Sequence, residues 1–163
     1  MDRVLELQGG RTATGHRFAI VVSRFNAPIT DGLLGGALSA LAEAEVAQED
    51  VAVVRVPGAF EIPLTARALA ETGQFDAVIC LGCLIKGDTM HFEYIAEAAT
   101  HGIARASAET GVPMAFGVLT TLTEAQAIVR SEPGPENKGR EAALAAVEMT
   151  TLLRGIVDAG AGQ

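Results

Sequence analysis

Short runs of consecutive apolar residues alternate along this chain with longer stretches whose apolar residues recur every three or four positions. The short runs are rich in β-branched and aromatic residues, and polar residues, glycine or proline bound each of them. This pattern predicts strands that are buried on both faces of a parallel sheet. The four predicted strands are Phe18–Val22, Val51–Val56, Ala77–Leu81 and Met114–Leu119.

The longer stretches predict helices, because apolar residues three and four positions apart share one helix face. Two local signals support them. Pro63 suits the first turn of a helix, and Thr123 with Gln126 fits a capping box. The expected helices cover residues 29–44, a segment beginning near Pro63, a segment carrying Phe92, Ile95, Ala99 and Ile103, a short segment ending near Arg130, and residues 137–157.

Strands that alternate with helices predict an α/β protein with a parallel, doubly wound sheet. We expect a single domain over residues 1–163, with a core at 16–157 and a tail at 158–163. Residues 1–15 hold a further short strand, Val4–Gln8, and a glycine-rich connection. This strand has no helix after it, so it could join an edge of its own sheet or of a neighbouring subunit's sheet. We favour pairing with the sheet of a neighbouring subunit.

Composition and charge limit the classes of function that the chain could have. The chain has 163 residues, of which 49% are hydrophobic, which is enough for a substantial core without disulfides. The net charge of −8 argues against non-specific nucleic-acid binding and against a role on anionic membranes. The longest apolar run, Ala77–Ile85, is far shorter than the roughly 20 residues that span a bilayer. With no apolar leader visible, we expect a soluble cytoplasmic protein.

Ligands of open α/β sheets bind beyond the carboxyl ends of the strands. His91 follows the third predicted strand near the start of a helix, where a neutral imidazole could relay a proton. A partly exposed helix-cap histidine is the alternative. Phe25 follows the first strand and is either a stacking platform for a ring or a loop anchor. Glu61 follows the second strand and either accepts hydrogen bonds from a polyol or favours a helix N-terminus.

Two segments carry candidate anion sites. Lys86-Gly87-Asp88-Thr89 has the composition of a small anion cradle, although a plain turn would have it too. Arg130 and Lys138 flank a helix-breaking loop and could clamp a phosphate, or they could be solvated helix ends. Cys80 and Cys83 have the spacing of a redox or metal pair. However, no second ligand cluster accompanies them, and residues three apart in a strand face opposite sides, so we interpret both as small buried hydrophobes.

Taken together, five blocks of the sequence resemble the 6,7-dimethyl-8-ribityllumazine synthase family, in the same order and spacing. The resemblance runs from about Val4 to Ile156. The blocks are Ser23–Asn26, Val56–Pro63, Leu81–Tyr94, Phe116–Thr121 and Asn137–Gly139.

This resemblance implies a three-layer α/β/α fold with a four-stranded, flavodoxin-like parallel sheet and an N-terminal strand that pairs with a neighbouring subunit. It implies a transferase that condenses 5-amino-6-(D-ribitylamino)uracil with 3,4-dihydroxy-2-butanone 4-phosphate in riboflavin biosynthesis, releasing phosphate and water. No metal or cofactor is implied. The implied assembly is a homopentamer, which some members pack into a sixty-subunit shell, and riboflavin synthase is a candidate partner.

The resemblance also assigns roles to residues. His91 would donate the proton. The pyrimidine and its ribityl chain would contact Phe25, Ala59, Phe60, Glu61, Cys83, Leu84, Ile85 and Phe116. The butanone phosphate would contact Asp88, Thr89, Arg130 and Lys138. Phe116 and Arg130 would reach across from a neighbouring subunit. Lys86 departs from the family, which more often has arginine there and hence a bidentate donor.

Two other functions stay open at this point. A relative that binds flavin or forms a shell without catalysis would share the fold. It would bind ligand without forming product. An aldolase that forms an imine on Lys86 is the third candidate, and borohydride trapping with a carbonyl substrate would reveal it.

Overall fold

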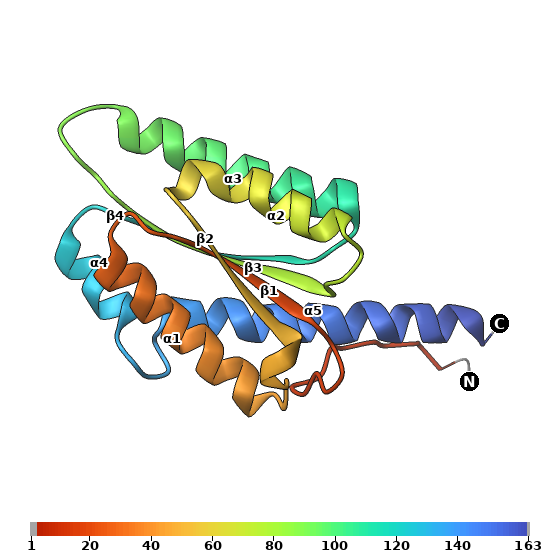
Figure 1. Cartoon of the computed structure of the whole chain (residues 1–163). Coiled ribbons are helices and arrows are strands. Elements are labelled where there is room, and N and C mark those ends of the chain that lie inside the picture. The colour runs from red at the N-terminus through yellow and green to blue at the C-terminus, as the bar shows by residue number, and fades with distance from the viewer. Residues whose placement is uncertain (1–2, 163) are drawn as a thin grey trace.

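Four parallel strands form one sheet between two layers of helices in the computed structural model, which describes residues 3–162 (Figure 1). The strand order is β2-β1-β3-β4. The strands are β1 (Phe18–Ser23), β2 (Val51–Val56), β3 (Ala77–Ile85) and β4 (Met114–Thr121). This is the α/β architecture with a flavodoxin-like parallel sheet that we expected.

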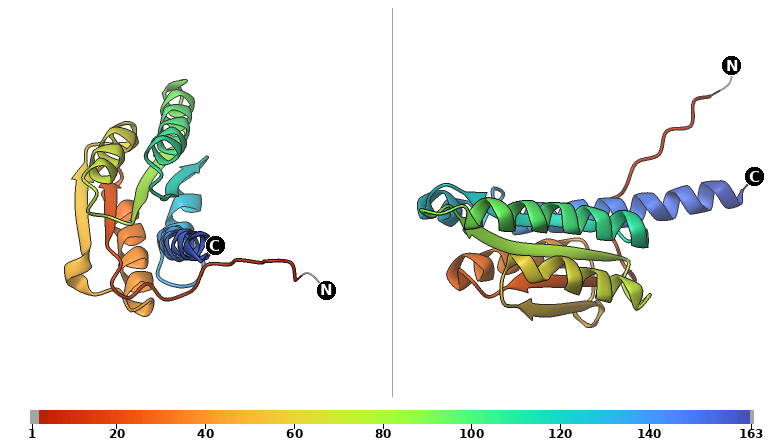
Figure 2. Two further views of the ribbon diagram at one scale, coloured as in Figure 1. Left: turned by 90° about the vertical axis from the view of Figure 1, so that its right-hand side faces the viewer. Right: turned by 90° about the horizontal axis from the view of Figure 1, so that it is seen from above.

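The helices divide between the two faces of the sheet. Helices α2 and α3 cover one face, and α1, α4 and α5 cover the other, as Figures 1 and 2 show. The helices are α1 (Ala27–Glu43), α2 (Ile62–Glu71), α3 (His91–Thr110), α4 (Glu124–Ser131) and α5 (Lys138–Ala161), with short 3-10 turns η1 (Gln48–Asp50) and η2 (Ala59–Glu61). The expected capping box is present at the start of α4, where Thr123 accepts from the Gln126 N–H.

Several elements run further than predicted. Strand β3 continues through Gly82 to Ile85, and β4 continues to Thr121. Gly82 does not end its strand because the glycine serves packing: a Cβ there would lie 3.1 Å from Ile62 and 3.2 Å from the Ser23 hydroxyl. Helix α5 reaches Ala161 and so takes up most of the segment that we expected to be a tail.

The sheet separates two apolar cores. β1 is buried along its whole length, and most of β3 is buried too, whereas the edge strand β2 is only partly covered. Cys80 belongs to the core beneath α2 and α3, and Cys83 to the core beneath α1 and α5. The two thiols therefore face opposite sides of β3, which confirms that they are separate buried residues.

The N-terminal segment is an extended arm outside the sheet (Figure 2). Gly10 donates its N–H to the Thr151 hydroxyl of α5 at 2.7 Å, and a Cβ at Gly9 would collide with the Glu148 carbonyl oxygen. Before this contact the side chains of Val4 and Leu5 are exposed. Residues 3–10 form no strand with their own sheet, so that alternative is wrong, and pairing with a neighbouring subunit stays a prediction.

Candidate active site

A cavity of about 630 Å³ opens at the carboxyl ends of β1, β2 and β3, where parallel-sheet proteins bind ligands. Eight of the predicted site residues line it. They are Phe25, Ala59, Phe60, Glu61, Leu84, Ile85, Thr89 and His91. Pro57, Gly58, Gly87, Phe92 and Ile95 complete the wall.

Backbone hydrogen bonds hold the first aromatic of this cavity in place. The N–H of Phe25 donates to the Pro57 carbonyl at 3.1 Å, and the N–H of Arg24 donates to the Val56 carbonyl at 2.8 Å. The loops after β1 and β2 are thus joined. Phe25 is 69% exposed and Phe60 is 59% exposed. Two aromatic rings left open beside one cavity provide a surface for a flat ring to stack on.

Asn26 is a structural residue of this site to which we had assigned no role. Its φ of 61° and ψ of 46° place it in the left-handed region, where asparagine is among the few tolerated side chains. Its Nδ2 donates to the Cys83 carbonyl at 3.0 Å, tying the loop after β1 to β3. An asparagine in the loop after a predicted strand was the available signal.

Glu61 has one carboxylate oxygen committed to the fold. Its Oε2 accepts from the Gly58 N–H at 3.0 Å and closes the turn that carries Ala59 and Phe60. The residue is only half-buried, so its other oxygen stays free to accept from a polyol hydroxyl. The two interpretations of Glu61 are therefore compatible.

His91 is the first residue of α3, exposed at the mouth of the cavity. Its backbone N–H donates to the Thr89 hydroxyl at 3.4 Å. Neither atom of this contact is on the imidazole, so the ring is left able to exchange a proton with a bound molecule.

The remaining predicted residues lie elsewhere. Phe116, Arg130 and Lys138 line a second cavity, of about 270 Å³, at the carboxyl end of β4, and the two cavities share no residue. The Arg130 guanidinium donates to the Gln126 carbonyl, and Lys138 pairs with Glu141 at 2.7 Å. Both cations are on the surface, so a ligand phosphate could replace these partners.

Four of the residues that the sequence singled out line neither cavity. Asp88 is exposed and lines neither cavity. Lys86 lies 3.4 Å from the carboxylate of Glu93 with its ammonium accessible to solvent, which is not the desolvated setting that activates an imine-forming lysine. Burial raises the pKa of Cys83 to about 11 and that of Cys80 to about 12, so neither thiol is a nucleophile near neutral pH.

Within residues 3–162 no group of three or more His, Cys, Asp and Glu side chains is arranged to hold a metal ion. Over the same range, no helix is both long and apolar enough to cross a membrane.

The chain is similar to known proteins over most of its length. Residues 15–154 match the family model of 6,7-dimethyl-8-ribityllumazine synthase. The protein of that name from Salinibacter ruber is 51% identical over 147 residues, which cover 90% of this chain and 94% of the relative. The one from Syntrophus aciditrophicus is 53% identical over 149 residues, covering 91% and 97%.

Proposed function

The chain belongs to the 6,7-dimethyl-8-ribityllumazine synthase family, and from this premise we propose that its two cavities are the two parts of one active site. The protein is a transferase of riboflavin biosynthesis. It condenses 5-amino-6-(D-ribitylamino)uracil with 3,4-dihydroxy-2-butanone 4-phosphate and releases phosphate and water. The observation that carries the proposal is the meeting of Phe25, Glu61 and His91 in a single cavity.

The larger cavity takes the pyrimidine. Its ring stacks on Phe25, and the segment Ala59–Glu61 holds the ribityl chain through backbone groups and the free oxygen of Glu61. Leu84 and Ile85 contact the ring from β3. Cys83 contributes through its backbone only, because its side chain is buried in the core. The size and the aromatic character of the cavity support this assignment.

The smaller cavity takes the phosphate end of the other substrate. Arg130 offers a planar fork for two charge-assisted hydrogen bonds, and Lys138 adds a second positive charge. Phe116 closes the pocket around the pyrimidine ring from this side. Thr89 borders the phosphate from the larger cavity, and Asp88 occupies the same loop. In an acidic protein these two cations provide the local attraction that an anionic substrate needs.

The two parts join between subunits. Phe116, Arg130 and Lys138 line a cavity of their own in one chain, which fits a site completed by a neighbouring copy. We propose the homopentamer of the family as the assembly, with the exposed arm at Val4 and Leu5 adding to a neighbour's sheet. Sedimentation decides whether pentamers build a sixty-subunit shell, and co-sedimentation tests riboflavin synthase as its partner.

The reaction needs two reactants held face to face, one proton relay and a place for departing charge. The 5-amino group of the pyrimidine forms an imine with the ketone, whose oxygen leaves as water, and phosphate then leaves beside Arg130. Ring closure and dehydration follow. His91 moves protons between the imine nitrogen and the departing oxygen atoms. Holding both substrates in order raises the rate of the reaction, which explains why no nucleophilic side chain is required.

The test is to assay product formation with Arg130→Ala beside the parent protein. The variant should raise the KM for the butanone phosphate at least about tenfold and leave the KM for the pyrimidine within about twofold, since the lost fork faces only the phosphate. Lysine at this position should restore binding in part. Ligand binding without product in the parent protein would contradict the proposed function and favour the catalytically silent relative.

A further inference from the structure

Asn137 makes an unusual number of hydrogen bonds for one buried side chain. It is 1% exposed and lies between α4 and α5, directly before Lys138. Its Nδ2 is 3.0 Å from the carbonyl oxygens of Ser131 and Glu132 and 3.1 Å from that of Gly32. Its Oδ1 accepts from the Arg140 N–H at 3.0 Å. One amide thus joins the end of α4, the beginning of α5 and the middle of α1.

These contacts exceed what a helix cap requires. Serine, threonine or aspartate would cap α5 with an oxygen alone, and they do so about as well as asparagine. Only an amide supplies N–H donors as well, and here the donors go to the connection that carries Pro133, Gly134 and Pro135. The amide therefore fixes the path of that connection in addition to capping α5.

Helix α1 is built to admit this amide. A Cβ at Gly36 would lie 2.1 Å from Oδ1 of Asn137, and a Cβ at Gly32 would lie 2.5 Å from the Ser131 carbonyl oxygen. The neighbouring Gly35 has nothing within 4 Å of its Cβ position. Two glycines one turn apart thus leave the space that Asn137 and the end of α4 occupy.

We propose that Asn137 is a positioning residue for the phosphate site, setting the separation of Arg130 and Lys138; this rests on the function proposed above. Arg130 directly precedes Ser131, and Lys138 directly follows Asn137, so the amide holds the backbone beside both cations. Arg130 is exposed and Lys138 is half-buried, and it is this backbone that keeps both on one cavity. Misplacing a charged group by about 1 Å costs up to about a hundredfold in rate or affinity.

The decisive variant is Asn137→Ser, which keeps an oxygen to cap α5 and removes the Nδ2 amide that donates to the three carbonyls. In the full-length protein in its native assembly, it should raise the KM for the butanone phosphate roughly five- to fiftyfold. Inhibition by inorganic phosphate should weaken in parallel, and the KM for the pyrimidine should change less than about twofold. Val147→Ala, which removes buried volume from α5 about three turns away, is the control for lost stability and should leave both constants unchanged.

A second pair of variants covers the case in which Asn137→Ser folds poorly. Gly36→Ala pushes the amide from the α1 side and should raise the same KM, whereas Gly35→Ala should not. In the background of Arg130→Ala, Asn137→Ser should add little, because the two then act on one interaction.

The outcomes separate the two proposals. An unchanged KM for the butanone phosphate in Asn137→Ser and Gly36→Ala, beside an impaired Arg130→Ala, overturns the positioning role alone. Equal weakening of both substrates overturns it as well, since that is the signature of a purely structural residue. If Arg130→Ala itself keeps a normal KM, the phosphate site proposed above is wrong, and the role of Asn137 falls with it.

Discussion

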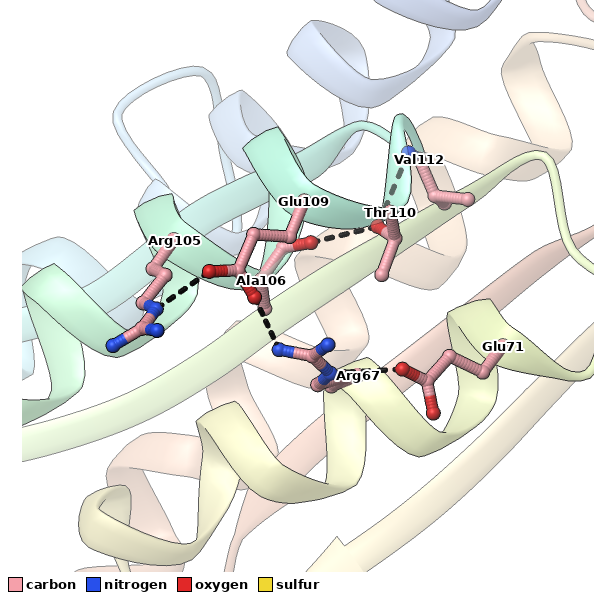
Figure 3. Close-up of polar contacts among 7 residues, drawn as sticks. All are labelled: Arg67, Glu71, Arg105, Ala106, Glu109, Thr110 and Val112. Atoms are coloured by element: carbon pink, nitrogen blue, oxygen red, sulfur yellow. Dashed lines mark hydrogen bonds and ion pairs between the residues drawn. The ribbon is translucent and has the colours of Figure 1, made fainter.

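The two helix layers of this protein are held together in different ways. Helices α1 and α5 approach so closely that a Cβ at Gly139 would lie 1.9 Å from the Leu33 carbonyl oxygen. Helices α2 and α3 meet through side chains instead: a Cβ at Gly102 of α3 would lie 2.7 Å from the Pro63 ring of α2. Both layers have an ion pair between their helices, and in the α1/α5 layer it joins Arg140 to Glu43 at 2.7 Å. Arg67 of α2 bonds Glu71 of its own helix and Glu109 of α3, and Arg105 bonds Glu109 at 2.6 Å (Figure 3).

This difference matches what each layer does. Close backbone packing between α1 and α5 leaves no room for either helix to shift. The proposed phosphate cations lie at the edge of this layer. The α2/α3 layer has exposed ion pairs, which contribute little to stability, and it leaves an open cavity at the amino end of α3. We conclude that the α1/α5 layer mainly provides rigidity and that the α2/α3 layer provides access for the substrate.

Gly139→Ala should have the largest effect. Its Cβ would meet backbone, which cannot turn aside as a side chain can, so the free energy of unfolding should fall by about 3 kcal/mol. Gly35→Ala, on the exposed side of α1, should instead stabilise the protein by up to about 1 kcal/mol. Urea denaturation at matched protein concentration measures both. A mild loss in Gly139→Ala would mean that α1 and α5 can separate freely, and the contrast between the layers would disappear.

His91→Ala tests the functional side of the comparison. Turnover should fall by roughly ten- to a thousandfold, because the proton relay is lost while stacking on Phe25 survives. The melting temperature should barely change, since the imidazole is exposed. His101→Ala, an exposed histidine of the same helix, is the matched control and should keep full turnover. A His91→Ala enzyme with normal turnover between about pH 6 and 8 would refute the relay.

The two thiols report on the layers separately, because Cys80 faces α2/α3 and Cys83 faces α1/α5. Burial raises both pKa values from 9.0, that of Cys83 to about 11. The thiolate fraction near neutral pH is then about a hundredfold below that of an unfolded chain, so a thiol reagent should label the native protein very slowly. Gly139→Ala should speed labelling of Cys83 more than that of Cys80. Equal acceleration would show that the layers open together.

Arg67→Ala should have the smallest effect, lowering the melting temperature by no more than about 2 °C at physiological salt. Arg105 and Arg67 hold the pKa of Glu109 below its ordinary value of 4.5. A lowered carboxyl pKa means that the stabilisation is present above about pH 4.5 and is lost as the pH falls through the folded value. The difference between parent and variant should therefore vanish in acid and at high salt. A large, salt-independent loss would place Arg67 among the residues that hold the fold.

Local chemistry made much of the fold predictable. Alternating apolar runs and helical spacings gave the order of strands and helices, and the Thr123 capping box gave the start of α4. The ends of the strands and helices were harder to predict. Gly82 resembles a strand break in the sequence, yet it lies within β3, where a Cβ would be in tight contact with Ile62 at 3.1 Å. Likewise, α5 runs past the expected end at residue 157 to Ala161, and Arg154 lies 3.8 Å from Asp158 across that expected end.

The site was predictable as a set of loops and residues but not as a geometry. Parallel strands end at one edge of their sheet, so the sequence alone determined that Phe25, Glu61 and His91 lie near one another. The resemblance already implied that Phe116 and Arg130 come from a neighbouring subunit. The tertiary structure added that Lys138 shares a cavity with them, away from the first cavity, because strand order places β4 at the far edge.

Family, fold class and the types of reactive side chain were thus determined by the sequence itself, since they depend on residue identity and spacing. The role of Asn137 was decided by the tertiary structure. Its donors bind carbonyl oxygens, one of them 105 positions away at Gly32. Every residue carries such an oxygen, so a contact of this kind cannot be predicted from the amino-acid sequence. It exists only once α1, α4 and α5 have packed together.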